Sequence, residues 1–171
     1  MPLPRSASRD DTRRDVGGWS YRQIMTTGPT ITAITLGVRD VDVARAFYVD
    51  GLGFRPVLHL PDEISFVQCA PGQVLALWDV AQMPSEYGAV AHGPEAPPLS
   101  LGHTVQSADE VEQLYAAALA AGATSVSAPQ DREWGGASAC VADPDGFRWD
   151  FVFNPNFRGD ADGTVHLGAP S

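Results

Sequence analysis

Hydrophobic and polar residues alternate with a period of two in several short stretches of the chain, which predicts β-strands. In the stretch 30–38, Ile34, Leu36 and Val38 share one face and smaller residues share the other. The other predicted strands are 54–60, 64–70, 74–80, 99–105, 125–127, 136–142 and 147–153. Two apolar stripes at helical spacing predict helices that begin after Asp40 and after Ser107, whose side chains can cap the first turn.

This order of elements occurs twice, so the chain contains an internal repeat. Matching residues lie at a constant offset of 67: Val38, Asp42, Phe47, Tyr48 and Leu52 correspond to Val105, Asp109, Leu114, Tyr115 and Leu119. We therefore predict an α+β fold with two βαβββ modules, at 30–83 and 99–155. The modules are expected to form a curved eight-stranded mixed sheet with helices on the outer face and a ligand on the concave face.

The rest of the chain shows no periodicity. We expect an irregular leader at 1–29, a linker with four prolines at 84–98 and an irregular tail at 156–171. Met25 offers an alternative start, so the sequence leaves open whether residues 1–24 belong to the native protein.

The formal charge is −10, and all 11 basic residues are Arg. This balance argues against a nucleic-acid partner, because no basic stripe is available to neutralise phosphates. It is compatible with a cationic ligand, but a solvated acidic surface is the simpler explanation. The chain has neither an apolar run near the ~18 residues of a membrane span nor a secretory signal, so we expect a cytoplasmic protein that contacts no membrane and keeps Cys69 and Cys140 reduced.

The stretch 140–153 reads as strand, tight turn and strand, with Pro144 and Gly146 forming the turn. Asp150 shares a face with Arg148, opposite four aromatic residues. Three roles are open for Asp150: a structural partner of Arg148, an anchor for a basic or hydroxylated ligand, or a general acid or base if its apolar neighbours disfavour the charged form.

Two motifs carry a family resemblance: V-R-D-V-D-V-A-R-A-F-Y-V-D-G-L-G-F at 38–54 and D-P-D-G-F-R-W-D at 143–150. Together with the paired modules, they resemble the vicinal oxygen chelate superfamily over residues 30–155. That superfamily includes glyoxalases, extradiol dioxygenases, fosfomycin-resistance transferases and bleomycin-binding resistance proteins.

The resemblance implies that a metal, where one is used, is held at four matching positions: Ala33, Ala76, Ser100 and Asp150. Alanine has no donor atom, and one carboxylate cannot hold a transition metal, which needs about three or four donors. The four histidines do not fill the gaps, since even the closest, His103, is expected to point to the opposite face. We therefore expect no metal ligands and no cofactor.

Strand alternation then predicts which side chains line the concave face. The expected ligand-binding residues are Thr35, Phe66, Gln68, Trp78, Ser100, Thr104, Trp134, Arg148 and Asp150, with Asp150 also the candidate catalytic residue.

These residues predict a metal-independent small-molecule-binding protein, similar to the bleomycin-resistance branch and assembled as a homodimer. The partner is a small organic molecule, with a cation as one option. One alternative is a lyase, isomerase or cyclase that moves a proton through Asp150, and another is a divalent-metal-dependent glyoxalase-like or dioxygenase-like enzyme. The sequence leaves open the ligand, whether turnover occurs, and whether modules pair within or between chains.

Overall fold

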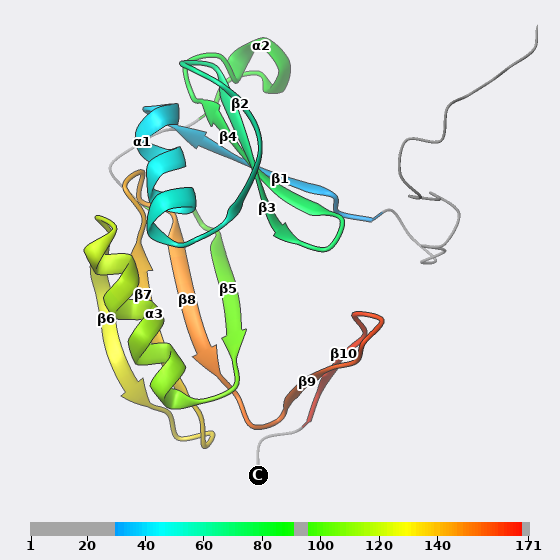
Figure 1. Cartoon of the computed structure of the whole chain (residues 1–171), viewed down its shortest axis with the longest axis vertical. Helices are drawn as coiled ribbons and strands as arrows, with labels where there is room; N and C mark the ends of the chain where they lie inside the picture. Colours follow the sequence, from blue (N-terminus) through cyan, green and yellow to red (C-terminus); the bar gives the residue numbers. More distant parts are fainter. Residues whose placement is uncertain (1–29, 91–95, 169–171) are drawn as a thin grey trace, which may run out of the picture. The chain divides into compact units, whose positions relative to one another are not determined.

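Two modules with the same order of elements make up most of the computed structural model, which describes residues 30–90 and 96–168 (Figure 1). Module one consists of β1 (Ala33–Val38), α1 (Val41–Arg45), the π-helical turn η2 (Ala46–Gly51), β2 (Arg55–Leu60), β3 (Ile64–Ala70) and β4 (Gln73–Asp79). Module two consists of β5 (Ser100–Val105), α3 (Ala108–Ala120), β6 (Thr124–Asp131), β7 (Ala137–Ala142) and β8 (Arg148–Phe153). The predicted leader and Met25 lie outside the described residues.

Each module forms a four-stranded mixed sheet, with the orders β1-β4-β3-β2 and β5-β8-β7-β6. The first pair in each sheet is parallel and the other pairs are antiparallel. The predicted α+β class and the two βαβββ modules are confirmed. The expectation of one eight-stranded sheet needs refinement, because the ladders among the described residues join strands of the same module only.

Both main helices begin where the sequence predicts. The Asp40 carboxylate accepts hydrogen bonds from the backbone N–H groups of Asp42 and Val43, at 3.0 and 2.9 Å. The Ser107 hydroxyl accepts from the N–H of Glu110 at 3.2 Å. These bonds satisfy donors that a helix start leaves without an intrahelical partner.

Short elements also occur where the sequence predicts irregular chain. The linker contains α2 (Pro84–Tyr87), and the tail contains a hairpin of β9 (Phe157–Gly159) and β10 (Val165–Leu167). Three-residue strands carry too little alternation to be recognised from sequence. None of the described helices has the length and hydrophobicity needed to cross a membrane.

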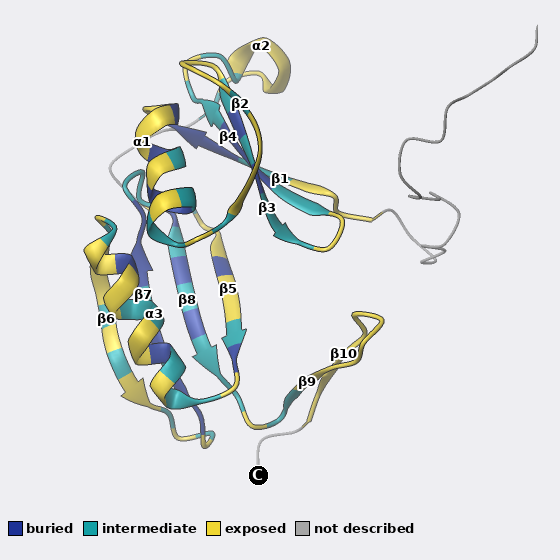
Figure 2. Cartoon of the chain, in the orientation of Figure 1, coloured by how far each residue is buried: buried dark blue, intermediate teal, exposed yellow. Residues whose placement is uncertain are grey.

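One face of each sheet packs against the helices of its module. The central strands β3, β4, β7 and β8 are buried or half-buried, whereas the edge strands β2 and β6 are mostly exposed (Figure 2). The buried residues shared by this core include Leu36, Val38, Phe47, Tyr48, Leu75, Leu77, Leu101, Val105, Val141, Trp149 and Phe151. The opposite faces carry half-buried or exposed side chains such as Thr35 and Asp150. The helices therefore cover one face of each sheet and leave the other open for a ligand or a partner.

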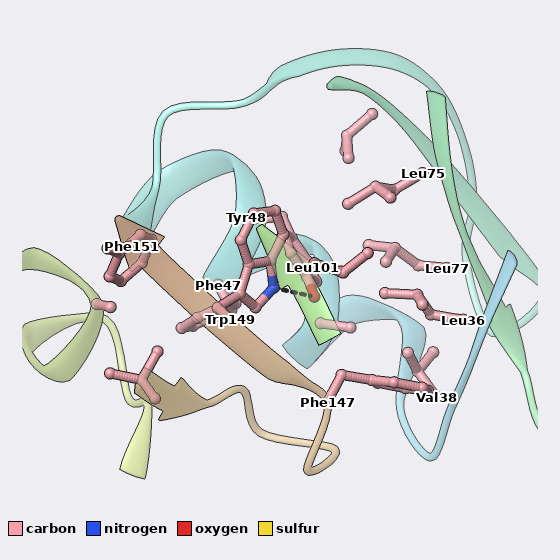
Figure 3. Close-up of a cluster of buried hydrophobic side chains, with 14 of the residues drawn as sticks. Leu36, Val38, Phe47, Tyr48, Leu75, Leu77, Leu101, Phe147, Trp149 and Phe151 are labelled. Carbon is pink, nitrogen blue, oxygen red and sulfur yellow. Dashed lines mark hydrogen bonds between the residues drawn. The ribbon is translucent and has the colours of Figure 1, made fainter. Parts of the chain in front are cut away.

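A buried hydrogen-bonded chain connects the two modules through Tyr48. Its hydroxyl donates to the Asp143 carboxylate at 2.6 Å. The same hydroxyl accepts a hydrogen bond from the indole N–H of Trp149 at 3.1 Å (Figure 3). Burial raises the pKa of Asp143, although its hydrogen bonds act in the opposite direction. Burial also raises the pKa of Tyr48, so its hydroxyl keeps its proton and remains a donor.

The turn at 143–146, called here the D-P-D-G turn, makes a second connection to module one. Asp143 organises the turn by accepting from the N–H groups of Asp145 and Phe147, both at 2.9 Å. The Asp145 carboxylate accepts from the backbone N–H and the Nε of Arg39, at 2.9 and 3.0 Å. Asp143 and Asp145, two of the residues that predict the tight turn, therefore also form hydrogen bonds to module one.

We expect Tyr48→Phe to lower the free energy of unfolding by about 2–3 kcal/mol, because it leaves a buried carboxylate and a buried indole N–H without their partner. Tyr115→Phe is the matched control, since Tyr115 occupies the equivalent position in module two and its hydroxyl donates to exposed Ser125 at 2.7 Å. That loss should cost below about 1 kcal/mol. Urea unfolding of both variants measures the difference, and equal losses would contradict a special role for the Tyr48 chain.

Candidate functional site

The open face of the first sheet contains a hollow of about 520 Å³, called here the sheet-one hollow. Its lining residues come from β1, β3, β4, α2 and the adjoining turns: Ala33, Thr35, Glu63, Ile64, Phe66, Ala76, Trp78, Gln82, Ser85, Glu86 and Tyr87. Three of the predicted ligand-binding residues, Thr35, Phe66 and Trp78, therefore lie together.

Strand register explains this grouping. Ala76 on β4 is the partner of both Thr35 on β1 and Phe66 on β3, so the three residues form a row across the sheet. Because Ala76 is small, space remains between its neighbours on this face. Trp78 lies two residues further along β4 and therefore points to the same side.

Tyr87 adds an aromatic wall that strand alternation could not predict, because it belongs to α2 in the proline-rich linker. Its ring packs edge-on against Trp78, with ring centres 5.5 Å apart and planes at 82°. Tyr87 is 56% exposed, so it borders the opening of the hollow.

The polar part of the sheet-one hollow is acidic. Glu63 and Glu86 line it, and among residues 30–90 and 96–168 no Lys, Arg or His belongs to its lining. Aromatic rings and carboxylates both attract cations, and a cation placed over a Trp or Tyr ring gains about 0.5–2 kcal/mol. The hollow can therefore hold an organic cation with an apolar body.

The open face of the second sheet carries four more of the predicted residues: Ser100, Thr104, Arg148 and Asp150. Ser100 is the β5 partner of Arg148 on β8, and Gly102 is the partner of Asp150. Asp150 and Arg148 are half-buried. The guanidinium of Arg148 donates to the carbonyl of Gly146 at 3.0 Å, which connects this face to the D-P-D-G turn.

Cys140 is a neighbour of Asp150 that the sequence pattern did not connect with the site. The two residues are partners across β7 and β8, so both side chains face the open side of the sheet. Burial, together with the nearby Asp150 carboxylate, raises the pKa of the Cys140 thiol to about 11. At neutral pH the thiol is thus protonated and can donate to Asp150, and it is a poor nucleophile.

Two predicted residues lie outside these faces. Gln68 is the last regularly paired residue of β3 before a register shift between Gln68 and Ala70. It lines a separate hollow of about 270 Å³. That hollow, called here the seam hollow, is formed by both modules and is lined by Leu52, Gly53, Phe54, Arg55, Gln68, Cys69, His103, Leu114, Trp149 and Phe151. Trp134 lines a third hollow beside Asn154 and Leu167 of the C-terminal segment.

The family's metal positions do not carry a suitable donor set. Ala33 and Ala76 both line the sheet-one hollow, whereas Asp150 stands on the other sheet beside a protonated thiol. Among residues 30–90 and 96–168, no three His, Cys, Asp or Glu side chains are grouped so that they could hold a metal ion. His103 borders the seam hollow instead, although it is more exposed than the sequence analysis expected.

We expect Asp150→Asn to lower the pKa of Cys140, because the nearby negative charge disfavours the thiolate. A lower pKa gives more thiolate at a given pH, so alkylation of Cys140 by iodoacetamide at pH 8–9 should accelerate by roughly 3- to 10-fold. Mass spectrometry of both cysteines provides an internal control, since burial alone accounts for the raised pKa of Cys69. An unchanged rate at Cys140 would show that burial, and not Asp150, sets its pKa.

Solved structures similar to this chain share its modular architecture. A glyoxalase-related enzyme from Fulvimarina pelagi is 36% identical, with a TM-score of 0.72 over 82% of this chain and 99% of that chain. A glyoxalase/bleomycin resistance protein/dioxygenase from Nocardioides is 24% identical, with a TM-score of 0.64 over 85% and 93%. A lactoylglutathione lyase from Agrobacterium tumefaciens is 22% identical, with a TM-score of 0.58 over 74% and 94%. The last two likenesses show the fold alone.

No curated protein matches the chain in a sequence comparison. Residues 30–151 match the sequence model of one family, and this match covers both modules, the D-P-D-G turn and β8 up to Phe151. The chain therefore belongs to the Glyoxalase/Bleomycin resistance protein/Dioxygenase superfamily.

Proposed function

We propose that this chain is a metal-independent protein that binds a small organic cation on the open faces of its sheets. The observation that carries the proposal is the sheet-one hollow, where Phe66, Trp78 and Tyr87 lie with two carboxylates and where no basic side chain of the described part of the chain is present. A cation gains from both groups, whereas an anion meets like charge. The formal charge of −10 adds a long-range attraction for cations.

Metal independence is supported by the side chains at the four family positions. Alanine at 33 and 76 offers no donor atom, and a neutral Ser100 hydroxyl is a poor ligand. The alanines also leave space on the face of the first sheet, and the hollow beside them is large enough for a small organic molecule.

We further propose that a second copy of the chain completes the site. The sheet-one hollow is lined by residues of module one and α2 only, and Ser100 and Asp150 lie on the open face of the other sheet. Leu58 and Leu60 on β2 are 49% and 40% exposed, which leaves apolar surface next to the hollow. In a homodimer, the second sheet of one copy could lie over the first sheet of its partner. This arrangement would cover the sheet-one hollow and the apolar surface next to it.

Benzyltrimethylammonium is a suitable probe for the cation site. Trp78→Ala should weaken its binding by about 3- to 30-fold, since a cation–π contact is worth up to ~2 kcal/mol when desolvated. Glu86→Gln should also weaken binding, whereas Glu133→Gln, which changes a carboxylate outside the hollow, should not. Calorimetry measures the affinities, and EDTA-treated protein should bind as well as untreated protein. Equal effects of the two Glu variants, or binding lost with EDTA, would contradict the proposal.

Two variants that damage opposite halves of the site test the homodimer. Trp78→Ala removes an aromatic wall of the first sheet, and Ser100→Trp fills the open face of the second. Each homodimer should bind the probe weakly, but a heterodimer purified with two tags should regain one of its two sites, because one site then combines the intact halves. Normal binding by Ser100→Trp, or no recovery in the heterodimer, would show that the site is not shared between chains.

An enzymatic function is the second candidate, and two observations favour it. The relative from Fulvimarina pelagi, at 36% identity, is described as a glyoxalase-related enzyme. In addition, Asp150 is half-buried on an open face, and the neighbouring Cys140 thiol can donate a hydrogen bond to its carboxylate. In a lyase, isomerase or cyclase, Asp150 would move a proton within the bound substrate.

The test of this second candidate separates turnover from binding. Asp150→Asn keeps the shape of the side chain and removes its capacity to take up a proton, so turnover of a substrate should stop while binding of the same molecule stays within about threefold. Glu112→Gln, on the exposed face of α3, provides the control. Turnover that survives in Asp150→Asn would exclude Asp150 as the proton carrier.

A further inference from the structure

The seam hollow is a second cavity that the proposed function does not use. It lies where the end of η2 and strand β3 of module one meet β5, β8 and α3 of module two. Its volume of about 270 Å³ is at the lower end of ligand pockets, which suits a molecule with a single ring.

Aromatic side chains form its inner wall. Trp149 and Phe151 are neighbours on β8, with ring centres 6.4 Å apart and planes at 27° (Figure 3). Phe54 packs against Trp149 with ring centres 5.7 Å apart and planes at 66°. The indole N–H of Trp149 is already bonded to Tyr48, so the wall offers apolar ring surface and no free donor from Trp149.

The polar side chains around this wall have the opposite sign to those of the sheet-one hollow. Arg55 and His103 line the seam hollow and are exposed, and Gln68 is half-buried beside them. None of the lining residues that the structure describes carries a carboxylate. The guanidinium of Arg55 donates to the Gln68 side-chain oxygen. That bond uses one of the five donors of a guanidinium and helps to hold the group in place.

Cys69 completes the lining and fits an apolar ligand. Burial raises the pKa of its thiol, so it adds no negative charge at neutral pH. The lining therefore combines an aromatic wall, a neutral thiol and a guanidinium, in a chain whose formal charge is −10. A guanidinium matches the geometry of a carboxylate through two parallel N–H···O bonds.

We propose that the seam hollow is a binding site for a small aromatic carboxylate, whose ring lies against Trp149 and Phe54 and whose carboxylate pairs with Arg55. The site is independent of the cation site, since it shares no lining residue with the sheet-one hollow. Because both modules contribute to it, a bound molecule also bridges the modules and stabilises the folded chain.

The test uses the full chain with benzoate as the probe, and benzamide and benzylamine as neutral and cationic molecules of similar size. Backbone amide NMR should show saturable shifts at Phe54 and His103 with benzoate, weaker binding with benzamide and none with benzylamine. Arg55→Gln should weaken benzoate binding by about tenfold or more and leave benzamide binding unchanged, because only the charged pair is lost. Arg55→Lys keeps the positive charge but lacks the paired N–H donors of the guanidinium, so its affinity for benzoate should lie between those of Arg55→Gln and the unaltered protein.

Arg158→Gln is the matched control, because Arg158 is exposed on β9 and lies outside the hollow. Its affinity for benzoate should equal that of the unaltered protein. Equal losses in Arg55→Gln and Arg158→Gln would show only a general charge effect and overturn the proposal. Shifts centred on Trp78, equal binding of benzoate and benzamide, or no saturation would overturn it as well. Benzoate shifts at Trp78 would also count against cation selectivity in the sheet-one hollow. The other outcomes do not bear on the cation site, because its probe and variants are different.

Discussion

Two carboxylates in one turn connect the modules, and the rest of the structure depends on them. Asp143 accepts a hydrogen bond from Tyr48, and Asp145 accepts two from Arg39. Both donor residues lie more than 90 positions earlier in the chain than the carboxylates they contact. A buried carboxylate is costly unless its oxygens are paired, and Asp143 also accepts two backbone N–H groups of its own turn. The same bonds that form the turn therefore fix how β8, with Asp150 and Trp149, stands against module one.

A comparison of equivalent residues in the two modules shows what is particular to this connection. Tyr48 and Tyr115 are equivalent in the two modules, yet Tyr48 is buried between Asp143 and Trp149 while Tyr115 bonds to exposed Ser125. Alternation and capping predicted both modules and nearly all strands, because these signals are local. They could not show that a tyrosine of one module would meet a turn of the other, since that contact depends on tertiary packing. The sequence analysis accordingly singled out Asp150 and overlooked Asp143.

The same limit explains the candidate site. Thr35, Phe66 and Trp78 share a hollow because they lie on regular strands, where a period of two fixes the direction of each side chain. Gln68 precedes a register shift, and Trp134 lies in a turn, so alternation could not locate either of them. Tyr87, Glu63 and Glu86 were missed because they belong to a short helix and to turns. The sequence therefore could not predict the opening of the sheet-one hollow, where the charged side chains lie.

The sheet-one hollow and the seam hollow differ more in the charge of the side chains at their openings than in the aromatic side chains of their walls. Both have aromatic walls, and an aromatic contact contributes about 0.5–1.5 kcal/mol with ligands of either sign. Like charges placed together cost several kcal/mol, so the rim decides which ion enters. Under the two proposals, Glu63 and Glu86 would select against anions at the sheet-one hollow, and Arg55 would select against cations at the seam hollow. Under the same proposals, this acidic chain would bind two ligand classes at separate sites, because its charged side chains are distributed differently between the open face of the first sheet and the seam hollow.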